Sequence, residues 1–397
     1  MGDDYQDGDV DPNLNVCGDC FDDSGLQTFV KDYARSKVCD FCGNEDDEDI
    51  AAPLEEVIAH IKTCARVLYS DPDNAGMGYE SAEGGYQGTV WDTYEFVRDE
   101  LQLELPNDDD EKLFHAICDG LGDQLWSSAT PYSLDPDERL EYSWRSFCDE
   151  VKHSRRFFFM LREKESFSEE ISPERLLETI LNYSIGEGLV KRIDAGQQLF
   201  RVRKQMNGQK HTTSASLGPP PVEIAIQTNR MSPPGIVMMY VSEDQNTALA
   251  ETDDGPGSYA VGRFQTNREI QILDLVDLPD VPSFFAEIPD TAEYNPRTAI
   301  SFLHGVAEDI SRPIARDDRV HIEYVPTQVV TEYFRNVTLE DESRLDGIRF
   351  RSSRVQNGVS LVLFADRSNV VGARDGDDFV PQSDEWIELN IVSEIQR

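Results

Sequence analysis

The sequence predicts an α+β protein in which a mainly helical first half is followed by a domain built on a mixed β-sheet. Apolar residues recur with a helical period through residues 51–193. In residues 194–397, short runs rich in valine, isoleucine and aromatic residues alternate with glycine and proline turns, which is typical of strands. A chain of 397 residues exceeds one comfortable core, so we expect two or three domains.

Composition indicates a strongly acidic globular protein. The chain has 77 acidic and 36 basic residues, a net charge of −41, with 39% hydrophobic residues. The negative electrostatic field of such a chain repels phosphates and anionic lipids, so it disfavours nucleic acids and membrane surfaces as general partners. The acidity fits either adaptation to high salt, where screening reduces self-repulsion, or an acidic protein of ordinary habitat.

The chain carries no signal for a membrane or for export. It contains no run of 18 apolar residues and no apolar segment near its start. We therefore expect a cytoplasmic protein.

Paired cysteines dominate the N-terminal region. Residues 1–16 are acidic and glycine-rich and predict a disordered tail. Residues 17–50 then carry the pattern C-x2-C-x18-C-x2-C, which predicts a zinc-ribbon-like segment with a closed, structural Zn²⁺ site. Disulfides are the alternative, and a reducing cytoplasm disfavours them. The four predicted ligands are Cys17, Cys20, Cys39 and Cys42.

Residues 51–193 predict a helical domain. An apolar stripe of helical period follows Pro53, and further stripes lie between residues 91 and 159. Ser172 is a capping residue followed by Pro173 at the first helical position, so another helix should begin there.

Arg145 and His153 suggest an alternative active site in this helical domain. Their order resembles the R-x4-6-H ribonuclease motif of HEPN domains, but seven residues separate them here. The basic cluster around them, Lys152, Arg155 and Arg156, more often marks a salt-bridged helix face. We therefore predict no separate catalysis here.

Residues 229–251 form the most informative stretch. A Pro-Pro-Gly turn at 233–235 precedes a short apolar run of strand length at 236–241. Ser242 with Gln245 forms a capping-box pattern, which predicts a helix start. A cation, an aromatic ring and a carboxylate on one compact unit could bind and cleave an anionic, sugar-containing ligand. These three residues are Arg230 on the loop, Tyr240 near the strand end and Glu251 in the helix.

The remaining elements of the second half are read from short apolar runs. One helix is expected at residues 299–310. Strands or β-like segments are expected at 199–203, 259–264, 270–275, 320–325, 347–351, 360–365 and 386–392.

In their order and spacing, these residues resemble the RES domain, a family named for its arginine, glutamate and serine. Tyr240 follows Arg230 by ten positions and Glu251 follows Tyr240 by eleven, as in the family. In two departures from it, Asn229 and Met231 flank the arginine in place of a glycine and an aromatic residue, and Phe350 replaces a tyrosine. The matching segments are Leu199-Phe-Arg-Val-Arg203, Asn229-Arg230, Tyr240-Val-Ser, Thr247-Ala-Leu-Ala-Glu251, Tyr324-Val-Pro-Thr-Gln328, Gly347-Ile-Arg-Phe-Arg-Ser352 and Val359-Ser-Leu-Val-Leu-Phe364.

The first half resembles the HEPN/RES N-terminal region that often precedes such domains. That region carries paired C-x2-C turns and a helix matched here by Trp144 to Arg156. The two resemblances together cover nearly the whole chain and imply a RES domain at 194–397.

The resemblance implies a fold similar to ADP-ribosyltransferases and an activity on NAD⁺. RES proteins are typically toxins paired with an Xre-like antitoxin. They deplete NAD⁺ as glycohydrolases or phosphorylases that break its nicotinamide–ribose bond, or they transfer ADP-ribose to a protein. A non-catalytic protein that binds a partner through its zinc ribbon and helices is the alternative from another class. The acceptor of ADP-ribose, the existence of an antitoxin and self-association stay open.

The resemblance also assigns roles to particular residues. Glu251 would stabilise the positive charge that grows on the ribose. Arg230, with Arg201 or Arg203, would bind the pyrophosphate, because a guanidinium fork matches phosphate oxygens. Tyr240 would stack on a flat ring or hydrogen-bond the ribose.

Ser352 completes the predicted site. Its hydroxyl would hydrogen-bond the nicotinamide carboxamide and hold the leaving group in register. Ser353 is adjacent in sequence and is the alternative for this role.

Overall fold

A computed structural model gives the fold, and it divides the chain into two compact units. Unit 1 comprises Met1–Arg139 and Asp280–Ala299, and unit 2 comprises Leu140–Pro279 and Ile300–Arg397. Among the described residues, no helix has both the length and the apolar character needed to cross a membrane. The structure describes residues 10–81, 84–159, 169–206, 208–252, 255–288, 293–314, 319–372 and 384–397.

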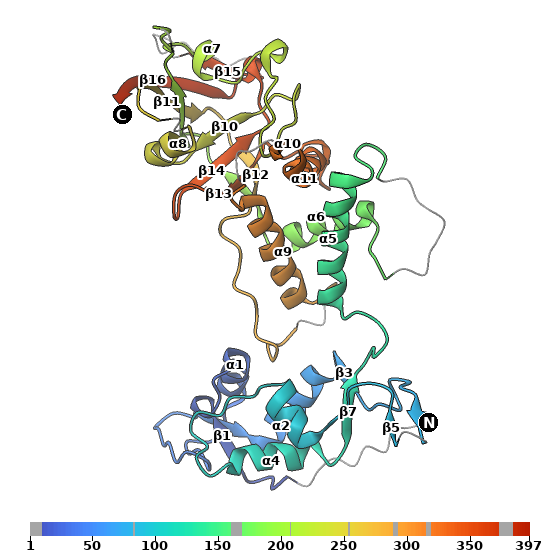
Figure 1. The fold of residues 1–397 in the computed structure, drawn as a ribbon. Coiled ribbons are helices and arrows are strands. Elements are labelled where there is room, and N and C mark those ends of the chain that lie inside the picture. Colours follow the sequence, from blue (N-terminus) through green and yellow to red (C-terminus); the bar gives the residue numbers. More distant parts are fainter. Residues whose placement is uncertain are drawn as a thin grey trace. The chain divides into compact units, whose positions relative to one another are not determined.

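Unit 1 combines short helices with small antiparallel sheets around one core (Figure 1). The predicted stripe after Pro53 lies on α2, whose Leu54, Val57 and Ile61 are fully buried. Residues 1–9 of the predicted tail lie outside the described residues, and Asn15 already belongs to a strand. The elements are β1 (Asn15–Cys17), η1 (Gly18–Cys20), α1 (Ser24–Tyr33), β2 (Ala51–Pro53), α2 (Leu54–Ala65), β3 (Tyr69–Ser70), β4 (Tyr79–Glu80), β5 (Gly85–Tyr86), β6 (Trp91–Asp92), α3 (Thr93–Glu95), η2 (Phe96–Glu100), α4 (Lys112–Leu121) and β7 (Leu125–Ser128).

Unit 2 is an α+β domain with a nine-stranded mixed sheet, as predicted for the second half of the chain (Figure 1). Its strand order is β15-β16-β11-β9-β10-β14-β13-β12-β8. The β12–β13 and β15–β16 pairs are parallel and the others are antiparallel. The elements are α5 (Pro136–His153), α6 (Pro173–Gly186), β8 (Val190–Ile193), β9 (Gln198–Lys204), α7 (Ser214–Leu217), η3 (Val222–Ile224), β10 (Met239–Ser242), α8 (Gln245–Thr252), β11 (Ser258–Thr266), β12 (Ile270–Asp274), α9 (Pro296–Ser311), α10 (Val320–Glu323), α11 (Val325–Asn336), β13 (Gly347–Arg351), β14 (Val359–Leu363), η4 (Arg367–Asn369), β15 (Val370–Gly372) and β16 (Ile387–Gln396).

The boundary between the units differs from the expected boundary at residues 193 and 194. Helices α5 and α6, predicted within the helical domain, bury Trp144, Phe147 and Ile180 in the core of unit 2. Strand β8 also pairs with β12 and belongs to the large sheet. The helical period was read correctly, but it does not reveal the surface against which a helix packs.

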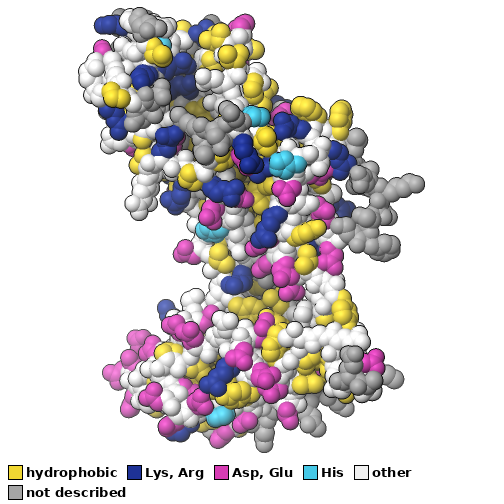
Figure 2. Space-filling model, in the orientation of Figure 1, with side chains coloured by type: hydrophobic (Ala, Val, Ile, Leu, Met, Phe, Trp, Pro, Cys, Tyr) yellow, Lys and Arg dark blue, Asp and Glu magenta, His cyan; other side chains and the backbone are white. Residues whose placement is uncertain are grey.

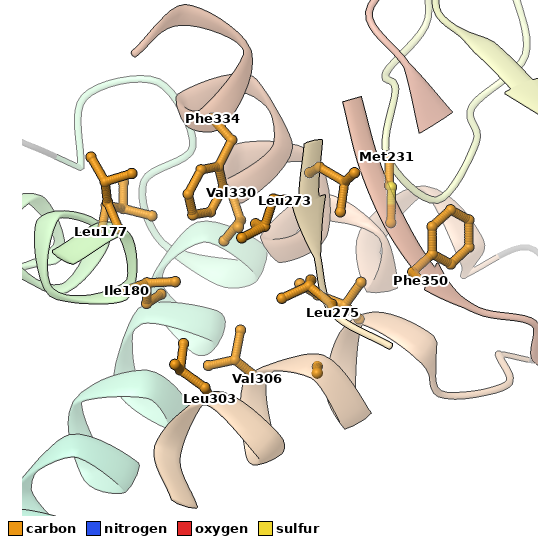
Figure 3. Packing of buried hydrophobic residues seen from close by; sticks show 14 of the residues in the cluster. Leu177, Ile180, Met231, Leu273, Leu275, Leu303, Val306, Val330, Phe334 and Phe350 are labelled. Atoms are coloured by element: carbon orange, nitrogen blue, oxygen red, sulfur yellow. The ribbon is translucent and has the colours of Figure 1, made fainter. Parts of the chain in front are cut away.

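The two faces of the sheet have separate cores. On one face, residues of α5, α6, α9 and α11 pack against β12, β13 and β14. Figure 3 shows Ile180, Leu303 and Phe334 from three of these helices turned toward Leu273. The opposite face holds a second cluster that contains Leu199 of β9, and α7 adds Leu217 to it.

At the centre of the sheet, strands β9 and β10 share a single pair of aligned residues. Strands β9 and β10 are aligned only at Ser242 and Phe200, whereas β9 is paired with β11 at seven positions and β10 with β14 at four. The sheet therefore consists of two halves, β15-β16-β11-β9 and β10-β14-β13-β12-β8, that meet at the β9–β10 junction.

Two local predictions were wrong. Residues 320–325 read as β-like, but Val320–Glu323 form helix α10, directly before α11. The helix predicted from the Ser242 capping pattern begins later, because the Asp244 carboxylate accepts from the backbone N–H of Thr247 at 2.9 Å. Aspartate caps helices as well as serine does, so the pattern alone did not select the residue.

The net charge is divided unevenly between the units. Unit 1 holds 39 acidic and 9 basic residues, a net −30, and unit 2 holds 38 acidic and 27 basic residues, a net −11. Figure 2 shows acidic side chains over the visible face of unit 1 and most of the visible basic ones over unit 2. A site for an anion is therefore electrostatically more favourable on unit 2.

Candidate functional site

Arg201 lies beside the β9–β10 junction. Its Nη1 donates to the backbone carbonyl of Tyr240 at 2.9 Å, and β9 has no residue registered opposite Tyr240. Burial, and secondarily the charge of Arg203, lowers the pKa of Arg201 to about 9. Within the described residues, Arg201 forms no ion pair with a carboxylate. A desolvated cation without a counterion favours the binding of an anion.

Tyr240 connects strand β10 to the loop that carries Arg230. Its hydroxyl lies 2.9 Å from the hydroxyl of Ser232 and accepts from the backbone N–H of Met231 at 3.3 Å. Burial raises the pKa of Tyr240 to about 12, so the phenol stays protonated near neutral pH. Strand alternation places this side chain on the helix-covered face, opposite to Leu199 and Arg201.

Core packing and one polar side chain anchor the rest of this loop. Met231, which departs from the family pattern, is fully buried and lies near Phe350 in the same core (Figure 3). Gln328 on α11 donates to the backbone carbonyl of Asn229 at 2.8 Å and to the hydroxyl of Thr228 at 3.0 Å. Asn229 and Met231, the neighbours of Arg230 that depart from the family pattern, therefore hold the loop in place.

Arg230 binds the C-terminal end of helix α9. Its Nη1 donates to the carbonyls of Ile310 at 2.7 Å and Arg312 at 2.8 Å. The guanidinium lies 5.5 Å from the ring centroid of Tyr324, and Nη2 makes a long contact of 3.5 Å with the hydroxyl of Ser353. A cation at a helix C-terminus complements the helix dipole, so this arrangement supports a positioning role for Arg230.

We expect Arg230→Ala to lower the free energy of unfolding by about 1–3 kcal/mol, because two carbonyls at the end of α9 lose a charged donor. Urea unfolding measures this change. The control is Arg344→Ala, since Arg344 is exposed on unit 2. An unchanged stability with a raised KM would instead assign Arg230 to ligand binding alone.

Glu251 and Ser352 meet directly, although they are 101 residues apart in the chain. The hydroxyl of Ser352 donates to Oε1 of Glu251 at 2.5 Å. The Ser352 hydroxyl oxygen itself accepts from the backbone N–H groups of Arg354 at 3.1 Å and Val355 at 3.2 Å. A hydroxyl has one donor and two acceptor positions, so that of Ser352 is fully used. This geometry supports a role in orienting the Glu251 carboxylate rather than contact with a carboxamide.

Arg203 points toward α7 instead of toward Glu251. Its Nη2 donates to the carbonyl of Gly218 at 2.8 Å. Strand alternation places it on the same face as Arg201, two residues away. The Glu251–Ser352 pair and the loop of Arg230 and Tyr240 are neighbours, because the charge of Glu251 opposes the lowering of the pKa of Arg230 by burial and Arg230 also contacts Ser353. Arg201 and Arg203 form a separate arginine row on β9.

The four predicted cysteine ligands lie together in unit 1. Their sulfurs are all within 4.8 Å of one another, and all four cysteines are free of disulfides. The distances are 3.8 Å from Cys17 to Cys20, 3.4 Å from Cys17 to Cys42 and 3.6 Å from Cys20 to Cys39. A tetrahedral tetrathiolate site with metal–sulfur bonds of about 2.3 Å has edges of about 3.8 Å. The cluster therefore fits a metal ion.

Arg145 and Lys152, from the basic stretch of α5, both form ion pairs. Arg145 is paired with Glu141 at 2.7 Å, one turn away on the exposed surface of α5. Lys152 of the same cluster is paired with Glu323 at 3.0 Å. The first is a salt bridge along one helix face, as predicted, and the second joins α5 to α10.

Two neighbours of the site were not assigned from sequence. Tyr324 faces Arg230, and Gln328 holds the loop of Asn229. Both lie within a segment that matched the family pattern. Gln328 is buried beside Val325, Thr327 and Thr331 on the inward face of α11, and a polar residue within the apolar repeat of a helix is the signal that could have identified it.

Comparison with known families gives two matches. The RES domain model matches residues 198–381, and the model of HEPN/RES N-terminal domain 1 matches residues 32–165. Searches of curated proteins and of solved structures give no significant match.

Proposed function

We propose that this chain, which is a RES domain protein with a HEPN/RES N-terminal region, cleaves the nicotinamide–ribose bond of NAD⁺. A RES domain indicates an NAD⁺-related, toxin-type function. The observation that carries the finer assignment is the 2.5 Å hydrogen bond from Ser352 to Glu251, which orients a carboxylate on the last turn of α8. The division of the sheet into two halves also fits a fold similar to ADP-ribosyltransferases.

The chemistry requires a carboxylate of this kind. When the bond breaks, its electron pair leaves with nicotinamide, which departs neutral, and positive charge grows on the ribose. In our proposal, Glu251 lies next to the ribose and stabilises that charge. When water is the acceptor, its oxygen attacks C1′ of the ribose and its proton passes to Glu251.

The arginine row would hold the other part of the substrate. Arg201 is desolvated and lacks a described counterion, so a pyrophosphate bound there offsets the cost of burying the cation. Tyr240 would contact the ligand from the β10 side of the junction. Arg230 keeps its loop and the end of α9 in place.

We expect Ser352→Ala to lower kcat by about ten- to a hundredfold with a smaller effect on KM, because a hydrogen bond to a charged group contributes about 1.5–3 kcal/mol. Steady-state rates of nicotinamide release measure this. Ser352→Thr, which keeps the hydroxyl, is expected to retain more activity.

Ser353→Ala is the matched control for the neighbouring serine, since among the described residues its hydroxyl has just the long contact with Arg230. A larger loss in Ser353→Ala than in Ser352→Ala would exchange the two assignments.

The decisive experiment measures NAD⁺ turnover with and without inorganic phosphate. Release of nicotinamide at equal rates in both conditions identifies water as the acceptor, and acceleration by phosphate with formation of a phosphorylated ribose identifies phosphorolysis. Label from NAD⁺ on protein identifies the alternative activity, ADP-ribosyl transfer. Absence of both NAD⁺ binding and turnover would favour the non-catalytic interaction protein.

The biological assignment rests on the family resemblance. We propose that the protein is the toxin of a toxin–antitoxin pair with an Xre-like partner. Induced expression should then lower cellular NAD⁺ and arrest growth, and the partner should prevent both. Growth arrest without loss of NAD⁺ would contradict this proposal.

For the cysteine cluster we propose Zn²⁺ as the bound ion. Four thiolates in a closed tetrahedron leave no position for substrate, so the role would be structural. The cluster brings together β1, η1 and the loop after α1.

A further inference from the structure

A second group of cations lies beside helix α7. Arg203 donates from Nη2 to the carbonyl of Gly218 at 2.8 Å, and Arg367 donates from Nη2 to the carbonyl of Ala215 at 2.7 Å. Both guanidinium groups thus donate to the same short segment, Arg367 to a carbonyl of α7 and Arg203 to the residue that directly follows it. His211 lies close enough for the charge of Arg203 to lower its pKa. We call Arg203, His211 and Arg367 the α7 cation cluster.

Two buried nitrogen atoms of this cluster are unsatisfied. Nε of Arg203 and Nδ1 of His211 have no hydrogen-bond partner within the described ranges. The carbonyls of Ala215 and Gly218 accept hydrogen bonds from the Nη2 atoms of the two arginines, but they do not provide partners for these two nitrogens. Buried polar nitrogens without a partner cost free energy, so they mark a place where a ligand atom would be favourable.

The electrostatics of the cluster point to an anion. Burial, followed by the charge of Arg367, lowers the pKa of Arg203. Burial, followed by the charge of Arg203, lowers the pKa of His211. Cations therefore repel one another here, inside a chain of net charge −41. An anion would remove this repulsion and accept hydrogen bonds from all three side chains.

We propose that the α7 cation cluster is a binding site for a phosphate group. Guanidinium forks match phosphate oxygens, and an imidazolium adds a third charged donor. Arg203 is two residues from Arg201 on the same face of β9, about 7 Å along the strand. The phosphate would therefore lie next to the group bound by Arg201.

The phosphate group has two sources that an experiment can separate. One is a phosphate monoester on the dinucleotide itself, which NADP⁺ carries and NAD⁺ lacks; this source rests on the proposed function. The other is free inorganic phosphate, which does not depend on that function.

NMR titration of the His211 imidazole in the full chain tests binding directly. We expect added inorganic phosphate, compared with chloride at equal ionic strength, to raise the pKa of His211 by about one unit, because an anion stabilises the imidazolium. The signal is assigned by its loss in His211→Gln. Arg367→Gln should weaken the response to phosphate, while Arg344→Gln, which changes an exposed arginine of unit 2, should leave it intact.

Turnover of NAD⁺ and NADP⁺ by the same variants then identifies the source. The KM for NADP⁺ is divided by the KM for NAD⁺ in each variant. A rise of about tenfold in this ratio in His211→Gln places the phosphate monoester of NADP⁺ in the cluster. An unchanged ratio with a His211 response to phosphate assigns the site to inorganic phosphate. A response to phosphate without any turnover would retain the site and reject the proposed function. No response to phosphate together with an unchanged ratio overturns this proposal.

Discussion

Glu251→Gln is expected to lower kcat for nicotinamide release from NAD⁺ by about a hundred- to a thousandfold, the size of effect seen when one preorganised electrostatic group is removed. The amide keeps the shape of the side chain and can still accept from the hydroxyl of Ser352. It carries no negative charge, so it cannot stabilise the positive charge on the ribose. Because substrate binding is assigned mainly to arginines, KM should change much less than kcat.

A matched control separates this effect from a general loss of negative charge. Glu332 is exposed on α11, and Glu332→Gln removes one carboxylate from the same unit. Its activity should equal that of the unmodified protein. Nicotinamide release by Glu251→Gln within threefold of the unmodified rate would exclude Glu251 from the reaction.

Removal of the metal from the cysteine cluster is expected to unfold unit 1. Structural zinc binding is worth about 10–16 kcal/mol in small zinc domains, which matches or exceeds the whole stability of a typical domain. A strong chelator, or Cys39→Ser, should therefore abolish the cooperative thermal transition of unit 1. Circular dichroism follows the unfolding, and elemental analysis should find one zinc per chain before treatment.

Cys118→Ser is the control for the loss of a thiol, because Cys118 is a half-buried cysteine of α4 outside the metal cluster. It should keep both the zinc and the transition. A folded protein without metal, whose melting is insensitive to chelation, would contradict a structural metal site.

The sequence predicted much of the local structure correctly. Strands β11, β12, β13 and β16 were placed within a few residues, because alternating β-branched and aromatic residues fit a pleated surface that is buried. The helical stripe of α2 was likewise correct. Residues 320–325 were not, since a short apolar segment satisfies either period until its neighbours are known.

The members of the candidate site were easier to predict from the sequence than their contacts. The spacing of Arg230, Tyr240 and Glu251 marked one compact unit, and the family resemblance added Arg201 and Ser352. Neither indicated that Arg230 binds the carbonyls at the end of α9 or that Ser352 uses its whole hydroxyl on local groups and Glu251. The amino-acid types restrict the chemistry, whereas hydrogen-bond partners depend on segments far apart in the chain.

The sequence by itself determined the cysteine cluster, the helical and sheet-rich halves and the family, because each follows from spacing along the chain. Only the tertiary structure decided that α5 and α6 belong to the core of unit 2, and that the sheet divides at the β9–β10 junction. The direction of the Arg203 side chain toward α7 was also known only from the tertiary structure. The physical reason is that local spacing controls turns and periodicity, while packing and charge compensation depend on which distant surfaces meet.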